Sequence, residues 1–234
     1  HKDQNIELRQ AFVLTTMSWI TIAFFGALPF YLSNINLNFT DSFFESMSGI
    51  TTTGSTILIN IEASPPGILA WRSLLQWLGG IGVIVMAIAI FPMLSVGGMQ
   101  LFKAENFENP EKVVPRATSL TRGIFIIYSV LTLIWASLLY LSGMSSFDSI
   151  LHSMTTIATG GYSTKSGSIG AFNSQLIDWI IILGMIFGSL PFVHYLAMTK
   201  GSYRDLIKDS QVRWFLVLLT ILVLTIFSLL FLNG

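Results

Sequence analysis

Two short segments rich in threonine and glycine are the residues of this sequence best suited to chemistry. They are Gly49-Ile50-Thr51-Thr52-Thr53-Gly54-Ser55-Thr56 and Ile157-Ala158-Thr159-Gly160-Gly161-Tyr162-Ser163-Thr164. A potassium ion that has lost its hydration shell needs a cage of oxygens, which backbone carbonyls on such loops can supply. Glycine reaches backbone angles that other residues avoid, so it lets successive carbonyls turn toward one axis. Both segments are therefore candidate cation-coordinating loops.

The two segments occupy equivalent places in an internal repeat. A shift of 107 positions, without a gap, superimposes the following pairs: Asp41-Ser42 on Asp148-Ser149, Ser46-Met47 on Ser153-Met154, Ile50 on Ile157, Thr52 on Thr159 and Gly54 on Gly161. A single loop of this kind could equally be a polar turn between helices. Two matched loops favour the lining of a pore, because irregular backbone at membrane depth is tolerated only inside protein or along a watery cavity. The predicted filter positions are Thr51, Thr52, Thr53, Gly54, Ala158, Thr159, Gly160 and Gly161.

Each loop follows a semi-apolar stretch that is too short to cross a membrane. The stretches 41–51 and 148–158 would each reach roughly 16 Å as helices, about half of the hydrocarbon thickness. We expect two half-helices with Asp41 and Asp148 as their N-terminal caps. Their carboxyl ends, which carry partial negative charge, would then point toward the pore centre.

The remaining sequence provides long apolar helices around these half-helices. Hydrophobic residues make up 53% of the chain and charged residues 10%, whereas a soluble domain carries about a quarter charged residues. Stretches of about 20 apolar residues can span a bilayer as helix, and there are five candidates: 11–32, 67–94, 122–142, 175–198 and 213–232. We therefore predict an all-α integral membrane protein made of repeated helix, re-entrant pore loop, helix units.

The repeat divides the chain into consecutive parts. We expect a cytoplasmic flank at 1–10, a first pore unit at 11–94, a cytoplasmic loop at 95–121, a second pore unit at 122–198, a second cytoplasmic loop at 199–212 and the first helix of a truncated third unit at 213–234. Because the chain begins at His1 and stops just after an apolar run, we expect both of its ends to be cut.

The basic residues predict the orientation in the plasma membrane. Ten of the twelve lie in or beside the N-terminal flank and the two polar loops: Lys2, Arg9, Lys103, Lys112, Arg116, Arg122, Lys200, Arg204, Lys208 and Arg213. Lysine and arginine are retained on the cytoplasmic side. The N-terminus is therefore expected in the cytoplasm, and both pore loops are expected to enter from outside.

Several other residues allow a structural and a functional interpretation. Gly79-Gly80-Ile81-Gly82 lies in an apolar run and favours close helix packing over phosphate binding. His194 is expected to be a satisfied packing side chain rather than a proton carrier, and Asp178 to be solvated near the outer end of its helix. Four further acidic residues on the outer side could attract cations or could be ordinary solvated charges: Asp41, Glu45, Glu62 and Asp148.

Other classes of protein fit the sequence less well. Zero net charge gives no nucleic-acid footprint. A membrane-embedded enzyme is disfavoured, because there is no cysteine, no H-E-x-x-H and no G-x-S-x-G, and the histidines are scattered. We predict no enzymatic activity and no cofactor. A secondary transporter of another cation or solute, sodium-coupled or sodium-permeable, remains an alternative, as does an inactive truncated remnant.

Long motifs give the chain a specific resemblance. It resembles the potassium transporters of the Trk/Ktr/HKT superfamily, and most of all the bacterial Trk membrane subunit. The resemblance rests on Ser46 to Gly54, on Gln76-Trp77-Leu78-Gly79-Gly80-Ile81-Gly82 running to Phe91-Pro92, on residues 97–105 and on His152 to Thr164. Thr159 and Tyr162 depart from the pattern, since close relatives often place an aliphatic residue and a phenylalanine there.

The resemblance implies a potassium-channel-like fold with four repeats around one pore, of which this chain would hold two and the opening helix of a third. Glycine at the filter position, here Gly54 and Gly161, implies selectivity for potassium over sodium. The resemblance further implies a bacterial inner-membrane location, a homodimer and a cytosolic nucleotide-binding regulatory ring, which would meet the loops at 95–121 and 199–212.

Overall fold

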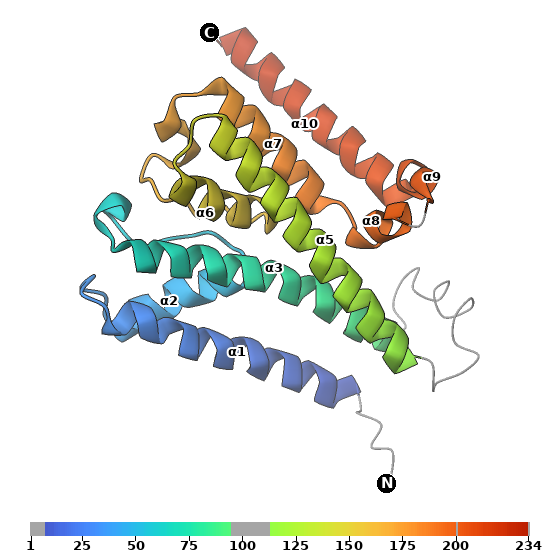
Figure 1. Ribbon diagram of the computed structural model, residues 1–234, viewed down its shortest axis with the longest axis horizontal. Helices are drawn as coiled ribbons and strands as arrows, with labels where there is room; N and C mark the ends of the chain where they lie inside the picture. The colour runs from blue at the N-terminus through green and yellow to red at the C-terminus, as the bar shows by residue number, and fades with distance from the viewer. Residues whose placement is uncertain (1–7, 95–112, 200, 234) are drawn as a thin grey trace. The chain divides into compact units, whose positions relative to one another are not determined.

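The computed structural model describes residues 8–94, 113–199 and 201–233, and the elements in these ranges are all helices (Figure 1). The chain divides into two compact units, His1–Ser189 and Leu190–Gly234. The helices of the first unit are α1 (Leu8–Leu32), α2 (Phe39–Ile50), the 3₁₀ turn η1 (Ile61–Ala63), α3 (Pro66–Leu94), α5 (Val113–Leu141), α6 (Ser146–Ile157), the 3₁₀ turn η3 (Ser168–Phe172) and α7 (Gln175–Ser189). Those of the second unit are α8 (Phe192–Thr199), α9 (Tyr203–Lys208) and α10 (Ser210–Asn233).

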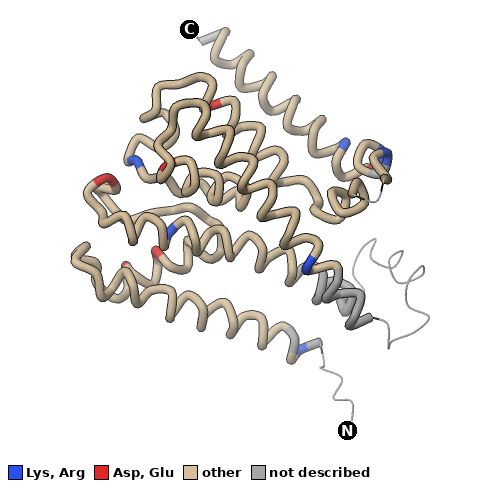
Figure 2. The backbone as a smooth tube through the Cα atoms, in the orientation of Figure 1, with Lys and Arg blue, Asp and Glu red and all other residues tan. Residues whose placement is uncertain are grey.

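The long helices have the length and composition of membrane spans. Within the described residues, four segments qualify by themselves: Phe12–Leu32, Pro66–Met86, Leu120–Leu141 and Ser210–Phe231. Counting α7 and α8 as one broken span gives five. Figure 2 shows long uncharged stretches along these helices, with most charged residues near helix ends and connections. The protein is therefore a multi-pass membrane protein, as its composition predicts.

The first unit contains the predicted repeat twice. The short helix α2 packs on α1 and α3, and the short helix α6 packs on α5 and α7 and also on α3. Ile50, the last residue of α2, lies in a buried cluster with Ala23, Phe30, Ile68 and Leu75, which come from α1 and α3. Both half-helices enter the bundle from the same end, beside the α1–α2 and α5–α6 connections (Figure 1). The prediction of helix, re-entrant loop and helix units is confirmed.

The caps of the half-helices differ from the prediction. α2 and α6 each have 12 residues and begin two residues earlier than expected. The N-cap residues are Asn38, whose side chain accepts from the Asp41 N–H at 2.9 Å, and Ser145, whose hydroxyl accepts from the Asp148 N–H at 3.0 Å. The prediction that Asp41 and Asp148 are the caps is thus wrong. They stand in the first helical turn, where a carboxylate stabilises the helix through its dipole.

Two helix boundaries also differ from the hydropathy pattern. α5 begins at Val113, inside the segment expected as a polar loop at 95–121, because hydropathy marks only the apolar part of a helix, here Leu120–Leu141. The expected single span at 175–198 is two helices, since α7 ends at Ser189 and α8 begins at Phe192. Pro191 explains the break, because proline lacks the N–H that a continuing helix needs.

In the second unit, the segment expected as a polar loop at 199–212 contains α9 and the start of α10. His194 on α8 has its Nε2 3.2 Å from Oδ2 of Asp209. Oδ1 of Asp209 accepts from the N–H groups of Gln211 and Val212 at 2.8 and 3.0 Å, so it caps α10. His194 is therefore a satisfied side chain, as predicted. Lys2, Lys103, Lys112, Lys200 and the motif at 97–105 lie outside the described residues.

Candidate cation filter

The two candidate loops, residues 51–56 (the first pore loop) and residues 158–163 (the second pore loop), leave their half-helices in the same way. The Thr52 N–H donates to the Gly49 carbonyl at 3.0 Å, and the Thr53 N–H donates to the Ser48 carbonyl at 2.9 Å. The second loop repeats both bonds at the 107-residue offset: Thr159 to Thr156 at 3.0 Å and Gly160 to Thr155 at 2.8 Å. This pair of bonds is the Schellman motif that ends many helices.

Both pore loops also contain the same unusual backbone conformation. φ is +55° at Thr52 and +80° at Gly54, and it is +52° at Thr159 and +84° at Gly161. Positive φ is a strained conformation for a β-branched residue such as threonine. Strained backbone of this kind concentrates at functional sites, where the surrounding structure holds it in place. In a regular extended strand, successive residues point to opposite sides. The left-handed residues Thr52, Gly54, Thr159 and Gly161 interrupt that pattern, so the backbone carbonyls of the pore loops do not follow it.

The two pore loops lie against each other at their glycines. A Cβ atom built on Gly54 would overlap the carbonyl oxygen of Gly160, whereas one built on Gly161 would meet nothing within 4 Å. The Gly160 carbonyl also accepts from Nε2 of Gln76 at 3.0 Å. Within the described residues, Gly160 is the one predicted filter position whose carbonyl oxygen accepts a hydrogen bond from a side chain. The structure thus brings Gly54 and Gly160 into close contact, whereas the space that a side chain at Gly161 would occupy is open.

The end of each pore loop is held by a buried side chain of its own half-helix. Glu45 accepts from the Thr56 hydroxyl at 2.9 Å and from the Ile57 N–H at 3.2 Å. His152, which follows Glu45 by the 107-residue offset, has its Nε2 3.0 Å from the Ser163 hydroxyl, the counterpart of Thr56. A glutamate in the first repeat and a histidine in the second therefore both bind the hydroxyl at the end of their pore loop.

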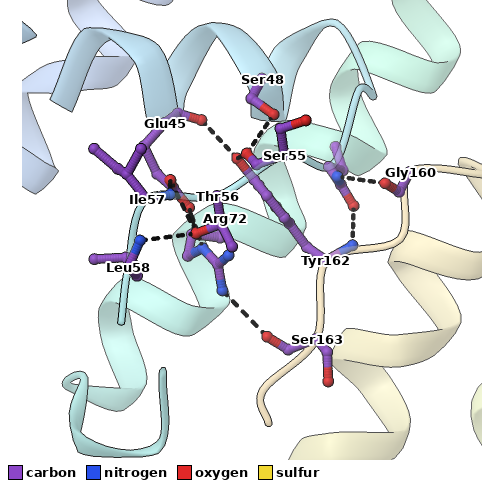
Figure 3. Close-up of polar contacts among 11 residues, drawn as sticks. Glu45, Ser48, Ser55, Thr56, Ile57, Leu58, Arg72, Gly160, Tyr162 and Ser163 are labelled. Atoms are coloured by element: carbon purple, nitrogen blue, oxygen red, sulfur yellow. Dashed lines mark hydrogen bonds and ion pairs between the residues drawn. The ribbon is translucent and has the colours of Figure 1, made fainter. Parts of the chain in front are cut away.

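Glu45 is also part of a buried ion pair with Arg72 of α3. Arg72 Nε lies 2.7 Å from Glu45 Oε1, and the two side chains are 1% and 0% exposed. Arg72 Nη1 donates to the Ser163 carbonyl at 3.1 Å, and its guanidinium lies 4.0 Å from the centre of the Tyr162 ring. The Tyr162 hydroxyl donates to the Glu45 carbonyl at 2.8 Å. As Figure 3 shows, these contacts join the first half-helix to the second pore loop.

This network corrects the interpretation of Glu45 as an outer-surface charge. The signal that could have revealed it is Arg72, one of the two basic residues outside the group that is expected to face the cytoplasm. A charge within an apolar helix requires a partner, and Glu45 is an acidic residue in a half-helix that must pack against that helix. Gln76 and Tyr162 carry no such signal in the sequence. Their roles depend on contacts over more than 80 positions, 84 between Gln76 and Gly160 and 117 between Tyr162 and Glu45.

The other outer acidic residues are less buried. Glu62 accepts from the Ser166 N–H at 2.7 Å and from the Ser166 hydroxyl, which ties the connection of the first repeat to that of the second. These hydrogen bonds lower the pKa of the Glu62 carboxyl, and the bond from the Ser166 hydroxyl has the larger effect. Asp178, which is expected to be solvated, is exposed on the surface of α7. Within the described part of the chain, no cluster of three or more His, Cys, Asp and Glu side chains could hold a metal ion.

The glycines of α3 make the close contacts that the sequence predicts. A Cβ atom on Gly79 would overlap the Ile50 carbonyl oxygen at the end of α2, and one on Gly80 would lie 2.5 Å from the Tyr128 hydroxyl. In the second repeat, a Cβ atom on Gly188 would lie 2.6 Å from the Ile157 carbonyl oxygen. A glycine of each outgoing helix therefore fits against the last residue of its half-helix. The predicted close helix packing is confirmed for Gly79 and Gly80.

Comparisons with known proteins agree with this architecture. The family model TrkH, described as a cation transport protein, matches residues 1–233. The Trk system potassium uptake protein TrkI of Halomonas elongata is 46% identical over 93% of this chain and 44% of its own length. The Trk system potassium uptake protein TrkH of Salmonella typhimurium is 40% identical over 97% of this chain and 48% of its own length.

A solved structure extends the agreement to three dimensions. The crystal structure of the potassium transporter TrkH from Vibrio parahaemolyticus matches with a TM-score of 0.85 and 35% identity, over 98% of this chain and 47% of that one. The chain thus spans about half the length of the relatives it matches. The sequence motifs, the doubled half-helix and loop, and the match along nearly all of its residues lead to one conclusion: the chain belongs to the TrkH family of cation transport proteins.

Proposed function

We propose that this chain supplies two pore loops of a potassium uptake protein, which conducts the ion through a filter of backbone carbonyls. The observation that carries the proposal is the matched backbone of the two loops, left-handed at Thr52 and Gly54 and again at Thr159 and Gly161. Relatives named as potassium uptake proteins support it. The proposed filter positions are Thr51, Thr52, Thr53, Gly54, Ala158, Thr159, Gly160 and Gly161. Potassium is the transported substrate, and we assign no cofactor and no enzymatic role.

The proposal includes an orientation and partners. We place the N-terminal flank in the cytoplasm of a bacterial cell and both pore loops on the outer side of the inner membrane, on the distribution of basic residues. Entry of both half-helices from one end of the bundle (Figure 1) suits a channel-like pore better than an inverted-repeat transporter for organic solutes. A homodimer and a cytosolic nucleotide-binding regulatory subunit are proposed on family resemblance.

The filter assignment predicts a loss of selectivity when Gly54 is replaced by serine in the full-length protein. The new side chain would overlap the Gly160 carbonyl oxygen, and serine at a φ of +80° is strained. The carbonyls of the two pore loops should therefore shift, and the ratio of potassium to sodium uptake should fall by about tenfold, equivalent to about 1.4 kcal/mol. Rubidium and sodium uptake by cells that lack their own potassium transporters measures this ratio.

Two glycine variants serve as controls. Gly143→Ser places a side chain at a φ of +104° but in open space, in the turn before α6, so it reproduces the strain away from the filter. Gly82→Ser lies in α3, where a Cβ atom would be 3.5 Å from the Trp19 ring, an ordinary contact distance. Both should keep the ratio of the unmodified protein. If either control changes the ratio as much as Gly54→Ser does, the filter lies elsewhere.

The chain alone is expected not to conduct potassium. A closed ring of carbonyls in a four-repeat pore needs four loops, the described residues provide two, and the chain covers 44% to 48% of its relatives' lengths. Liposomes that contain the purified 234-residue chain should therefore show no potassium flux above that of empty liposomes. A potassium flux whose selectivity over sodium falls in Gly54→Ser would contradict this expectation and would show that separate copies can complete a ring.

A further inference from the structure

Gln76 of α3 makes two hydrogen bonds to the backbone of the second pore loop. The side chain is fully buried. Its Nε2 donates to the Gly160 carbonyl at 3.0 Å, and its Oε1 accepts from the Tyr162 N–H at 3.1 Å. The two peptide groups that Gln76 binds are therefore those on either side of Gly161, the left-handed glycine. One rigid amide fixes both of them at once.

The geometry points to a specific role for this amide, which rests on the filter function proposed above. We propose that Gln76 is a positioning residue of the filter, which sets the orientation of the peptide groups around Gly161 and so contributes to the selection of potassium over sodium. The Gly160 oxygen that it binds is also the atom against which Gly54 packs. Gln76 thus determines where the first and second pore loops meet.

The chemistry of the side chain fits this role closely. A glutamine amide presents one donor and one acceptor side by side, which match a carbonyl and an N–H two residues apart. A carboxylate of the same shape has no hydrogen to donate, so it would face the Gly160 oxygen with an acceptor. An aliphatic side chain would leave both peptide groups of the loop without these partners in a buried environment, where unpaired polar groups are disfavoured.

The second repeat does not reproduce this contact within the chain. Gly79 and Gly188 occupy equivalent places, because each fits against the last carbonyl of its half-helix. Gln76 lies three residues before Gly79, and the residue three positions before Gly188 is Met185, which has no amide. The amide contact is therefore a property of α3 and the second pore loop.

The test replaces Gln76 by glutamate and by leucine in the full-length protein. Potassium and sodium fluxes are measured in proteoliposomes and normalised to protein that elutes as folded in size-exclusion chromatography. Both variants should lower the potassium-to-sodium ratio by about tenfold, the ratio that corresponds to one net hydrogen bond. Two variants are used because leucine can reduce the yield of folded protein. Glutamate has the same shape as glutamine and preserves the side-chain volume.

The matched control is Thr132→Val. Thr132 is a buried residue of α5 that accepts from Nε1 of Trp77 at 3.0 Å, so this variant also removes a part-buried hydrogen bond of α3, but one in which neither partner belongs to a pore loop. It should reduce stability and keep the ratio of the unmodified protein. If Gly54→Ser lowers the ratio while both Gln76 variants preserve it, the positioning role is wrong and the filter assignment stands. If neither position affects the ratio, the filter assignment itself is wrong, and the inference about Gln76 is overturned with it.

Discussion

Replacing Gly79 by alanine is expected to remove most of the folded protein. The added Cβ atom would overlap the carbonyl oxygen of Ile50, a backbone atom that cannot rotate away. Because Ile50 is the last residue of α2, α3 can relieve the overlap only by moving away from the half-helix that carries the first pore loop. Overpacking typically costs about 1–3 kcal/mol, and we expect the upper end of that range here. The measurements are the yield of monodisperse protein and its melting temperature in detergent.

Gly82→Ala provides the comparison within the same helix. Its Cβ atom would lie 3.5 Å from the Trp19 ring, at ordinary van der Waals distance. Alanine also favours the helix more than glycine does by roughly 0.5–1 kcal/mol, so this variant should be at least as stable as the unmodified protein. Equal melting temperatures for Gly79→Ala and Gly82→Ala would contradict the close approach of α3 to α2.

The sequence predicts the half-helices and their loops because short-range patterns determine them. Length alone prevents 41–51 from crossing a bilayer, and the 107-residue repeat assigns the same shape to 148–158. The helix boundaries are less accessible. Asn38 and Ser145 cap the half-helices from positions that hydropathy does not distinguish, and the break at Pro191 lies within a continuous apolar run.

The support behind the pore loops could not be predicted from local patterns, since it joins residues far apart in the chain. Arg72 binds Glu45 across 27 positions and the Ser163 carbonyl across 91. Composition indicates that a charge in an apolar helix needs a partner, but the choice of partner depends on how α2 and α3 pack. The same packing determines that the carbonyl oxygen of Gly160, a predicted filter position, accepts a hydrogen bond from the Gln76 amide.

The Arg72→Met variant is expected to show the largest loss of stability that we predict. Methionine keeps much of the side-chain volume but removes the charge, and so leaves the Glu45 carboxylate fully buried with only the neutral donors of Thr56 and Ile57. Breaking a buried ion pair by removing one partner costs about 3–5 kcal/mol. The melting temperature in detergent should fall accordingly. Arg122→Met, which removes an exposed arginine, should change stability by about 0.5 kcal/mol or less.

A double-mutant cycle distinguishes two contributions to the loss of stability: the lost attraction between Glu45 and Arg72, and the cost of leaving one buried charge without its partner. Glu45→Gln alone leaves the Arg72 guanidinium buried with the Ser163 carbonyl and the Tyr162 ring but without its counter-charge. Glu45→Gln combined with Arg72→Met removes both charges and keeps a neutral side chain near Thr56. Removing one partner of a buried ion pair leaves an uncompensated charge, whereas removing both charges leaves none, so the double variant should be more stable than Arg72→Met alone. Additive losses in the double variant would mean that Glu45 and Arg72 do not act as a unit, and that the first half-helix and the second pore loop are joined mainly by the bond from the Tyr162 hydroxyl to the Glu45 carbonyl.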